Sequence, residues 1–118
     1  MQTWDLTAID MPGGTRSPVV VDSEDEARAV LIGLDPGQEL GDHQVKEHAW
    51  VVVVEGTVEI ESDGRTTSVG AGTLLTFAPD ERHALRSVDG ARILLILAPW
   101  PGEGHYRGGG AARARVGA

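Results

Sequence analysis

The stretch GQELGDHQVKEHAWVVVVEG, residues 37–56, combines a turn, a histidine and an apolar run. Gly37 opens it, His43 follows at the sixth step, and Gly56 ends it. Residues 49–54 are apolar on both faces of an extended chain, which predicts a central strand covered on both sides. The stretch poses the question whether His43 belongs to a metal site or to a plain pair of strands.

Turn residues divide the rest of the chain into short segments. Pro-Gly pairs stand at 12–13 and 36–37, and Asp-Gly pairs at 63–64 and 89–90. Asp-Gly between alternating segments favours a hairpin, because glycine reaches positive φ without strain. The even spacing predicts a closed or sandwiched all-β fold. The predicted strands are 3–9, 16–21, 27–34, 49–54, 57–61, 65–69, 73–77, 83–88 and 92–98.

Length and composition exclude several classes of protein. The 118 residues are enough for one domain. No apolar run is long enough to span a membrane, and the N-terminus lacks the pattern of a signal peptide. The chain has no cysteine, which fits a reducing cytoplasm. A net charge of −8 and a single lysine, Lys46, argue against nucleic acid as a partner.

The chain divides into three parts by composition and predicted strands. Residues 1–26 are expected to form N-terminal strands that pack on a barrel, and residues 27–100 to form the barrel core. Residues 101–118 form a glycine-, alanine- and arginine-rich C-terminal segment that we expect to become flexible towards its end. Residues 98–106 contain two large aromatic side chains, Trp100 and Tyr106, so we expect this stretch to pack on the barrel or on a second subunit.

The opening stretch resembles the first motif of the cupins, in particular small single-domain bacterial cupins. That motif is Gly, five residues, His-x-His, three or four residues, Glu, six residues, Gly. Gly37, His43 and Gly56 fall in register with it. Val45 stands at the place of the second histidine, and Ala49 at the place of the glutamate.

A second cupin motif follows, with the pattern Gly, five residues, Pro-x-Gly, two residues, His, three residues, Asn. Gly72 and His83 match it, while Ala78 takes the proline place, Asp80 the glycine place and Ser87 the asparagine place. Together the motifs cover most of residues 29–99. The resemblance implies a single-domain double-stranded β-helix, the jelly-roll barrel of RmlC-like cupins. It implies much less about activity, since one fold hosts many functions.

In cupins the two first-motif histidines, the glutamate and the second-motif histidine hold one divalent metal inside the barrel. The equivalent inward set here is His43, Val45, Ala49 and His83. Two of its members offer no lone pair, and two imidazoles seldom hold a metal tightly. The resemblance therefore implies a degenerate metal site and no firmly bound cofactor.

Two neighbouring residues offer an alternative metal set. If Glu47 turns inward, it would join His43 and His83 in a two-histidine, one-carboxylate set, as in non-haem Fe(II) enzymes. His48 is a further candidate ligand, although a bulge would be needed to bring it inside. Such a set would take a divalent Fe, Mn, Ni or Zn ion. Otherwise, His43 and His83 are neutral imidazoles that bind each other, water or a small acid.

Three functions stay open on the sequence alone. The first is a small-molecule-binding cupin that works as a homodimer without a firmly bound metal. The second is a metal-dependent enzyme of the dioxygenase or isomerase type, so whether the protein is an enzyme is left undecided. The third is a structural or regulatory barrel that docks a partner protein. The expected ligand pocket comprises His43, Val45, Ala49, Phe77, Arg82 and His83.

Four further side chains carry specific expectations. Trp50 should face outward if Ala49 faces in, and Phe77 should lie in the core. The Ser87 hydroxyl is expected to bind backbone groups rather than to act as a nucleophile. Asp80 in a glycine position is tolerable, because aspartate visits left-handed backbone conformations more readily than most residues.

Overall fold

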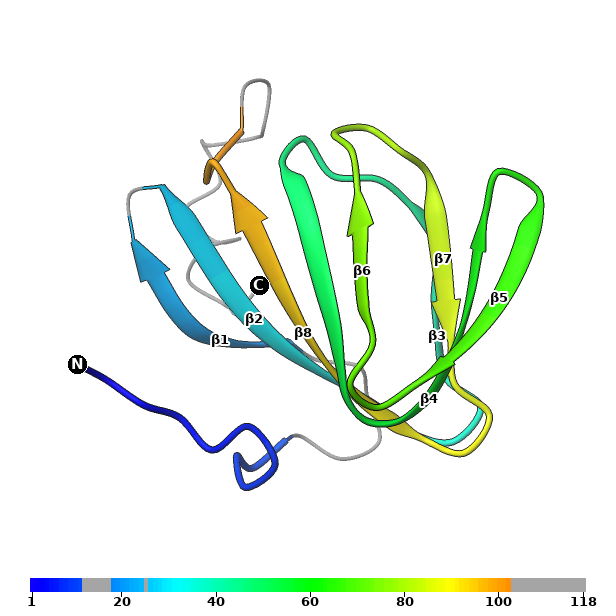
Figure 1. Ribbon diagram of the computed structural model, residues 1–118, viewed down its shortest axis with the longest axis horizontal. Helices are drawn as coiled ribbons and strands as arrows, with labels where there is room; N and C mark the ends of the chain where they lie inside the picture. The colour runs from blue at the N-terminus through cyan, green and yellow to red at the C-terminus, as the bar shows by residue number, and fades with distance from the viewer. Residues whose placement is uncertain (12–17, 25, 103–118) are drawn as a thin grey trace.

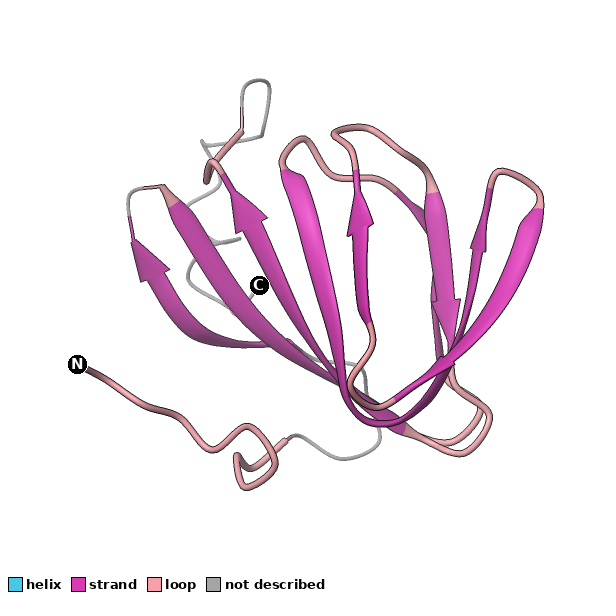
Figure 2. Cartoon of the chain, viewed as in Figure 1, coloured by secondary structure: helices cyan, strands magenta, loops and turns pink. Residues whose placement is uncertain are grey.

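The computed structural model of this protein describes residues 1–11, 18–24 and 26–102, and the side chains of Glu24, Asp42 and His43 also lie outside the description. Every regular element in these ranges is a strand (Figure 2). No helix in this part of the chain could cross a membrane. The strands are β1 (Pro18–Glu24), β2 (Ala27–Leu34), β3 (Glu39–His43), β4 (His48–Ser62), β5 (Arg65–Gly70), β6 (Leu74–Phe77), β7 (His83–Arg86) and β8 (Ala91–Ala98).

All strand pairs are antiparallel and form two curved sheets. Sheet A contains β1, β2, β8, the first half of β4, and β6. Sheet B contains β3, β7, the second half of β4, and β5. Figure 1 shows the sheets as two arms that meet at the bottom of the view and separate towards the top. The predicted all-β barrel is thereby confirmed.

The long strand β4 joins the two sheets. Two strands with a turn at Glu55 and Gly56 were expected, but β4 runs unbroken from His48 to Ser62. Its register against β8 shifts between Val53 and Glu55, and Gly56 has a φ of 80°. A Cβ on Gly56 would lie 2.2 Å from the Gly90 carbonyl oxygen. The glycine bends a continuous strand because it is packed against a backbone, and it does not end the strand.

Alternating apolar residues of the strands line the space between the two sheets. On β4, Ala49, Val51 and Val53 are buried, and after the bend Val58 and Ile60 are buried. They belong to one core cluster with residues of β2, β6, β7 and β8. The face of each sheet that carries this cluster is called the inward face below. The remaining members of the cluster are Val30, Ile32, Leu34, Phe77, Leu85, Ile93 and Leu97.

The N-terminal strand expected at residues 3–9 is absent, and the prediction was wrong there. The Asp5 carboxylate accepts hydrogen bonds from the Thr7 hydroxyl at 2.7 Å and the Thr7 amide at 3.1 Å. The Ala8 amide donates to the Asp5 carbonyl at 3.0 Å, so the chain turns here. The Thr7 hydrogen bonds, led by that of the hydroxyl, lower the pKa of Asp5.

Most of the other predicted strands are confirmed with small changes in their ends, although 49–54 and 57–61 are parts of one strand, and residues 16 and 17 of the strand expected at 16–21 lie outside the described residues. The strand at 27–34 is β2 without change, whereas the strand expected at 83–88 stops at Arg86. One strand, β3, was not among those predicted. Its sequence ELGDH has no apolar alternation, and it pairs with β7 through a register shift between Leu40 and His43.

The outer face of sheet A is partly covered by the N-terminal segment. The Met11 side chain lies 3.4 Å from the position of a Cβ on Gly33 of β2. The Arg92 guanidinium of β8 donates to the Leu6 carbonyl at 2.6 Å. Leu31, on the face of β2 opposite the core cluster, is fully buried. Leu6 and Met11 thus contact the barrel, while most other residues of the N-terminal segment, which forms no strand, are exposed.

Candidate functional site

One end of the barrel gathers buried ionisable side chains. At this end β2, β4 and β7 begin, while β6 and β8 finish, and it is called the open end here (top of Figure 1). The buried charged or polar residues of the described chain are Arg28, Glu47, His83 and Ser87. The first three lie in the strands or loops of the open end, whereas Ser87 follows β7 at the opposite end.

Strand register places a row of side chains across the open end. Arg28 of β2 pairs with Leu97 of β8, Leu97 pairs with Ala49 of β4, and Ala49 pairs with Phe77 of β6. Directly opposed residues of antiparallel strands share a face. Since Leu97, Ala49 and Phe77 belong to the core cluster, Arg28 also faces inward, and it is only 8% exposed.

His83 continues this row from sheet B. Its ring stacks on the Phe77 ring, with centroids 3.9 Å apart and planes 9° apart. Its Nδ1 lies 3.0 Å from the Glu81 carbonyl oxygen, which can only accept a hydrogen bond. In a neutral imidazole Nδ1 therefore carries the proton, and the lone pair belongs to Nε2. Nε2 is then the atom that could accept a proton or bind a metal.

Glu47 stands directly before β4 and is completely buried. It lies in the bend that leads into β4, so strand alternation does not fix its direction. Its Oε2 accepts a hydrogen bond from the Gly102 amide at 2.7 Å. The alternative metal set would need this carboxylate to face His83, whereas its printed hydrogen bond is to Gly102.

The loop between β3 and β4 is fastened to the loop before β7. The Asp80 amide donates to the Val45 carbonyl at 2.7 Å, and Lys46 Nζ lies 2.9 Å from Asp80 Oδ1. Asp80 has a φ of 65°, the left-handed conformation expected at that position. Val45 is half-buried and packs on the core cluster. His43 pairs with His83 along the backbone of β3 and β7, while its side chain lies outside the described residues.

Two of the predicted site residues do not join this inward set. His48 is half-buried, and its ring lies 4.9 Å from that of Trp50, its neighbour on the outward face of β4. The register of β4 is regular from His48 to Val53, so no bulge turns His48 inward. Arg82 is exposed at the start of β7. Trp50 faces outward, as predicted.

Arg28 is a site residue that the sequence did not bring to notice. Its guanidinium lies 4.1 Å from the centroid of the Trp100 ring, and Nε donates to the Ser23 hydroxyl at 3.2 Å. The alternation of Arg28 with Val30 and Ile32 in a predicted strand was the available signal. A charged residue at a strand end is usually solvated, so an inward position of Arg28 was not expected.

The described donors fall short of a metal site. No three His, Cys, Asp or Glu side chains in the described part of the chain lie together as metal ligands would. The methyl group of Ala49 occupies the position where the resemblance places a glutamate, and it is buried in the core. Glu47 and His83 supply two donors, fewer than protein metal sites generally use. His43, the third member of the alternative set, has its side chain outside the described residues.

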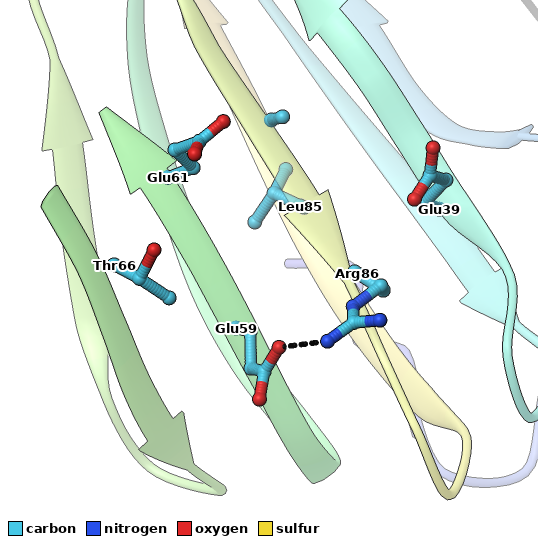
Figure 3. A pocket seen from close by; sticks show the side chains of 7 residues that line it. Glu39, Glu59, Glu61, Thr66, Leu85 and Arg86 are labelled. Carbon is cyan, nitrogen blue, oxygen red and sulfur yellow. Dashed lines mark hydrogen bonds and ion pairs between the residues drawn. The ribbon is translucent and has the colours of Figure 1, made fainter. Parts of the chain in front are cut away.

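A concave feature on the outer face of sheet B holds about 250 Å³ (Figure 3). Arg86 stands between Glu39 of β3 and Glu59 of β4 in register and binds the Glu59 carboxylate. That hydrogen bond raises the pKa of Arg86. Exposed ion pairs of this kind are common on protein surfaces. The lining residues are Glu39, Glu59, Glu61, Thr66, Ala84, Leu85 and Arg86.

Comparison with known proteins gives the same fold. The family described as a cupin domain matches residues 30–97. A conserved protein of unknown function from Streptococcus pyogenes, SPY1581, is 25% identical, with a TM-score of 0.72 over 83% of this chain and 87% of that one. An RmlC-like cupin protein from Desulfovibrio desulfuricans is 24% identical, with a TM-score of 0.73 over 84% and 97% of the two chains.

A third solved structure is an uncharacterised protein with a double-stranded β-helix domain from Klebsiella pneumoniae. It is 20% identical, with a TM-score of 0.75 over 86% of this chain and 92% of that one. No significant match exists among curated proteins. The solved structures therefore confirm the barrel architecture, and they name no substrate.

Proposed function

Since the chain belongs to the cupin family, we propose that it binds a small molecule at the open end of its barrel, with Glu47 and His83 as polar anchors. The observation that carries the proposal is the burial of a carboxylate, an imidazole and the Arg28 guanidinium at one end of the barrel. The fold alone does not support small-molecule binding, because the same barrel serves unrelated functions.

The cost of burying these groups supports a functional role. A buried ionisable group loses its hydration, and apolar side chains of similar volume often stabilise a core better. Such groups are therefore concentrated at binding and catalytic sites. Phe77, Ala49 and Val45 supply an apolar wall beside them. A few polar groups in an apolar surround are typical of small-molecule sites.

Two further side chains indicate that the barrel interior is not filled. Leu75 and Leu95 are the register partners of Val51 on either side of β4, so all three face inward. Val51 is 1% exposed, whereas Leu75 and Leu95 stay partly accessible. This accessibility favours a binding barrel over the structural barrel with a filled interior.

Small organic acids and amides are suitable probes of the proposed site, because a guanidinium or an imidazole can donate to either, and an amide N–H can also donate to a carboxylate. We expect members of such a set to shift the NMR signals of Ala49, Phe77 and His83. His83→Ala should weaken the binding of these probes about tenfold or more, the loss of one good polar contact. His48→Ala, on the outward face, is the matched control. Probes that shift only Glu61 and Thr66, in the outer groove, would contradict the proposal.

A metal-dependent cupin enzyme, of the dioxygenase or isomerase type, is the second candidate function. The complete burial of Glu47 favours it, because an inward carboxylate could complete a set with His43 and His83. A bound divalent metal would supply Lewis-acid chemistry and open coordination positions. The loss of ligand groups at Val45 and Ala49 argues against it.

Elemental analysis separates the two candidates. Protein purified without a histidine tag is expected to carry no stoichiometric Fe, Mn, Ni or Zn. A stoichiometric metal that is lost on His43→Ala and retained on His48→Ala would replace the first proposal by the second. The comparison is direct, since the two histidines lie on either side of Glu47 in the sequence.

We also propose that the protein acts as a homodimer through the outer face of sheet A. Along one register row, Leu31, Leu94, Val52 and Leu74 follow one another on β2, β8, β4 and β6. Leu74 is 58% exposed, and Leu94 and Val52 are only half-buried in the single chain. An apolar row of this kind favours packing against another protein surface, and we propose that this surface belongs to a second copy of the chain.

A further inference from the structure

The chain that follows β8 continues past the open end of the barrel (Figure 1). The Trp100 amide donates to the Glu26 carbonyl at 3.0 Å, directly before β2. The Trp100 ring packs on the core cluster and lies over the Arg28 guanidinium, 4.1 Å from ring centroid to Cζ. These contacts attach residues 99–102 to β2.

The same segment is attached to the loop before β4. The Gly102 amide donates to Glu47 Oε2 at 2.7 Å, in a buried hydrogen bond to a carboxylate. A Cβ on Gly102 would lie 2.9 Å from the Lys46 carbonyl oxygen and 3.2 Å from Glu47 Cγ. The backbone thus approaches this loop as closely as only glycine permits.

We propose that residues 99–102 are a strap that closes the open end, and that the Glu47 carboxylate is its latch. The strap lies beyond the last strand, so it can detach without breaking a strand pair. Its attachments include a hydrogen bond at Gly102, a ring contact at Trp100 and one backbone bond to Glu26. Loss of the latch frees one end of the strap while the barrel stays folded.

If the proposed function holds, the strap couples access to the open end of the barrel with ligand binding there. Glu47 is both the latch and a proposed anchor for the ligand. A ligand that engages this carboxylate competes with the Gly102 amide for it, so occupancy of the site and release of the strap are coupled. This step alone rests on the proposed function, and the strap itself can be tested with no ligand present.

The absence of cysteine provides a direct assay. Ala49→Cys introduces one thiol on the inward face of the open end, where the native residue is 1% exposed. We expect this thiol to react slowly with Ellman's reagent in the otherwise native chain. In the Glu47→Ala background the rate should rise about tenfold or more. In the Glu47→Gln background, whose amide oxygen can still accept from Gly102, the rate should stay low.

Two other single thiols separate strap opening from general unfolding. Val58→Cys lies on the inward face of β4 beyond the bend, where the native residue is 1% exposed, and its rate should not change with Glu47→Ala. Thr76→Cys is exposed on the outward face and should react fast in every background. An equal rise at positions 49 and 58, or no rise at 49, would overturn the proposal.

Trp100→Ala provides a second route if Glu47→Ala does not fold. This variant removes the contact with Arg28 and leaves the latch residue in place. It should also raise the Ala49→Cys rate while leaving the Val58→Cys rate unchanged. An unchanged Ala49→Cys rate would overturn the strap, and it would leave the probe-binding result on His83→Ala unaffected.

Discussion

At the scale of single residues, Ser87 illustrates how a motif position can be structural. The side chain is completely buried, and its hydroxyl donates to the Thr57 carbonyl at 2.8 Å. The same oxygen accepts from the Gly90 amide at 3.0 Å. Ser87 therefore joins the turn after β7 to the bend of β4. The expectation that backbone groups satisfy its hydroxyl is confirmed.

Ser87→Ala should lower the free energy of unfolding by about 1–3 kcal/mol, because two partly buried hydrogen bonds to the backbone are lost. Urea unfolding followed by circular dichroism measures the change. Ser62→Ala is the matched control: its hydroxyl also bonds to a carbonyl, that of Arg82, but at an exposed site. The control should change stability by less than about 0.5 kcal/mol. Equal losses in the two variants would contradict the structural role of Ser87.

The direction of a side chain could be predicted where motif spacing fixed the strand face on which it lies. Motif spacing placed Ala49 and His83 inward, and Phe77 was expected in the core. Arg28 was missed, because its inward position depends on its pairing with Leu97, 69 positions away in the chain (97 − 28). The Gly102 bond to Glu47 was missed for the same reason. Contacts between distant segments leave no local pattern.

At the scale of elements, β4 decides how the two sheets join. Its first half pairs with β6 and β8, and its second half with β5 and β7. A break was expected at Gly56, since glycine after a strand usually signals a turn. The structure uses that glycine for a close approach to Gly90. A glycine after an apolar run can thus mark a turn or a close backbone contact, and only the tertiary structure shows which of the two applies.

Two glycines with similar dihedral angles allow a matched test of this bend. Gly56→Ala should cost roughly 3 kcal/mol or more, from the strained φ of 80° and the clash with the Gly90 carbonyl. Gly64 has a φ of 76° but no atom within 4 Å of a Cβ. Gly64→Ala should therefore cost only about 1–2 kcal/mol.

Thermal or urea unfolding of both variants gives the comparison. The difference between them isolates the steric term, because the backbone strain is common to both. If Gly64→Ala is as damaging as Gly56→Ala, close packing at the bend of β4 does not matter. The Gly64 turn was also predicted correctly from sequence, since Asp63 and Gly64 both take positive φ values in the hairpin between β4 and β5.

At the scale of the whole molecule, the proposed homodimer depends on the apolar row over sheet A. Leu74 and Val88 are both large, exposed apolar side chains, at 58% and 55% exposure. Leu74 lies in that row, whereas Val88 lies in the turn after β7. They form a matched pair for substitution by a charged residue.

Sedimentation velocity at micromolar concentration tests the assembly. The native protein is expected to sediment as a dimer, and Leu74→Glu should raise the dimer dissociation constant by about tenfold or more, since it buries an unpaired charge. Val88→Glu should leave the dimer intact. A monomeric native protein, or equal effects of the two substitutions, would rule out this interface.

The strand order also determines when the protein can fold during its synthesis. β8 lies between β2 and β4 in sheet A, although it is made after both. Until its residues leave the ribosome, facing edges of β2 and β4 lack their partner, and such edges are sites of aggregation. The central pairing of the barrel therefore forms only after almost all the described chain has been made. This order places a demand on chaperones that a barrel assembled from successive hairpins would not make.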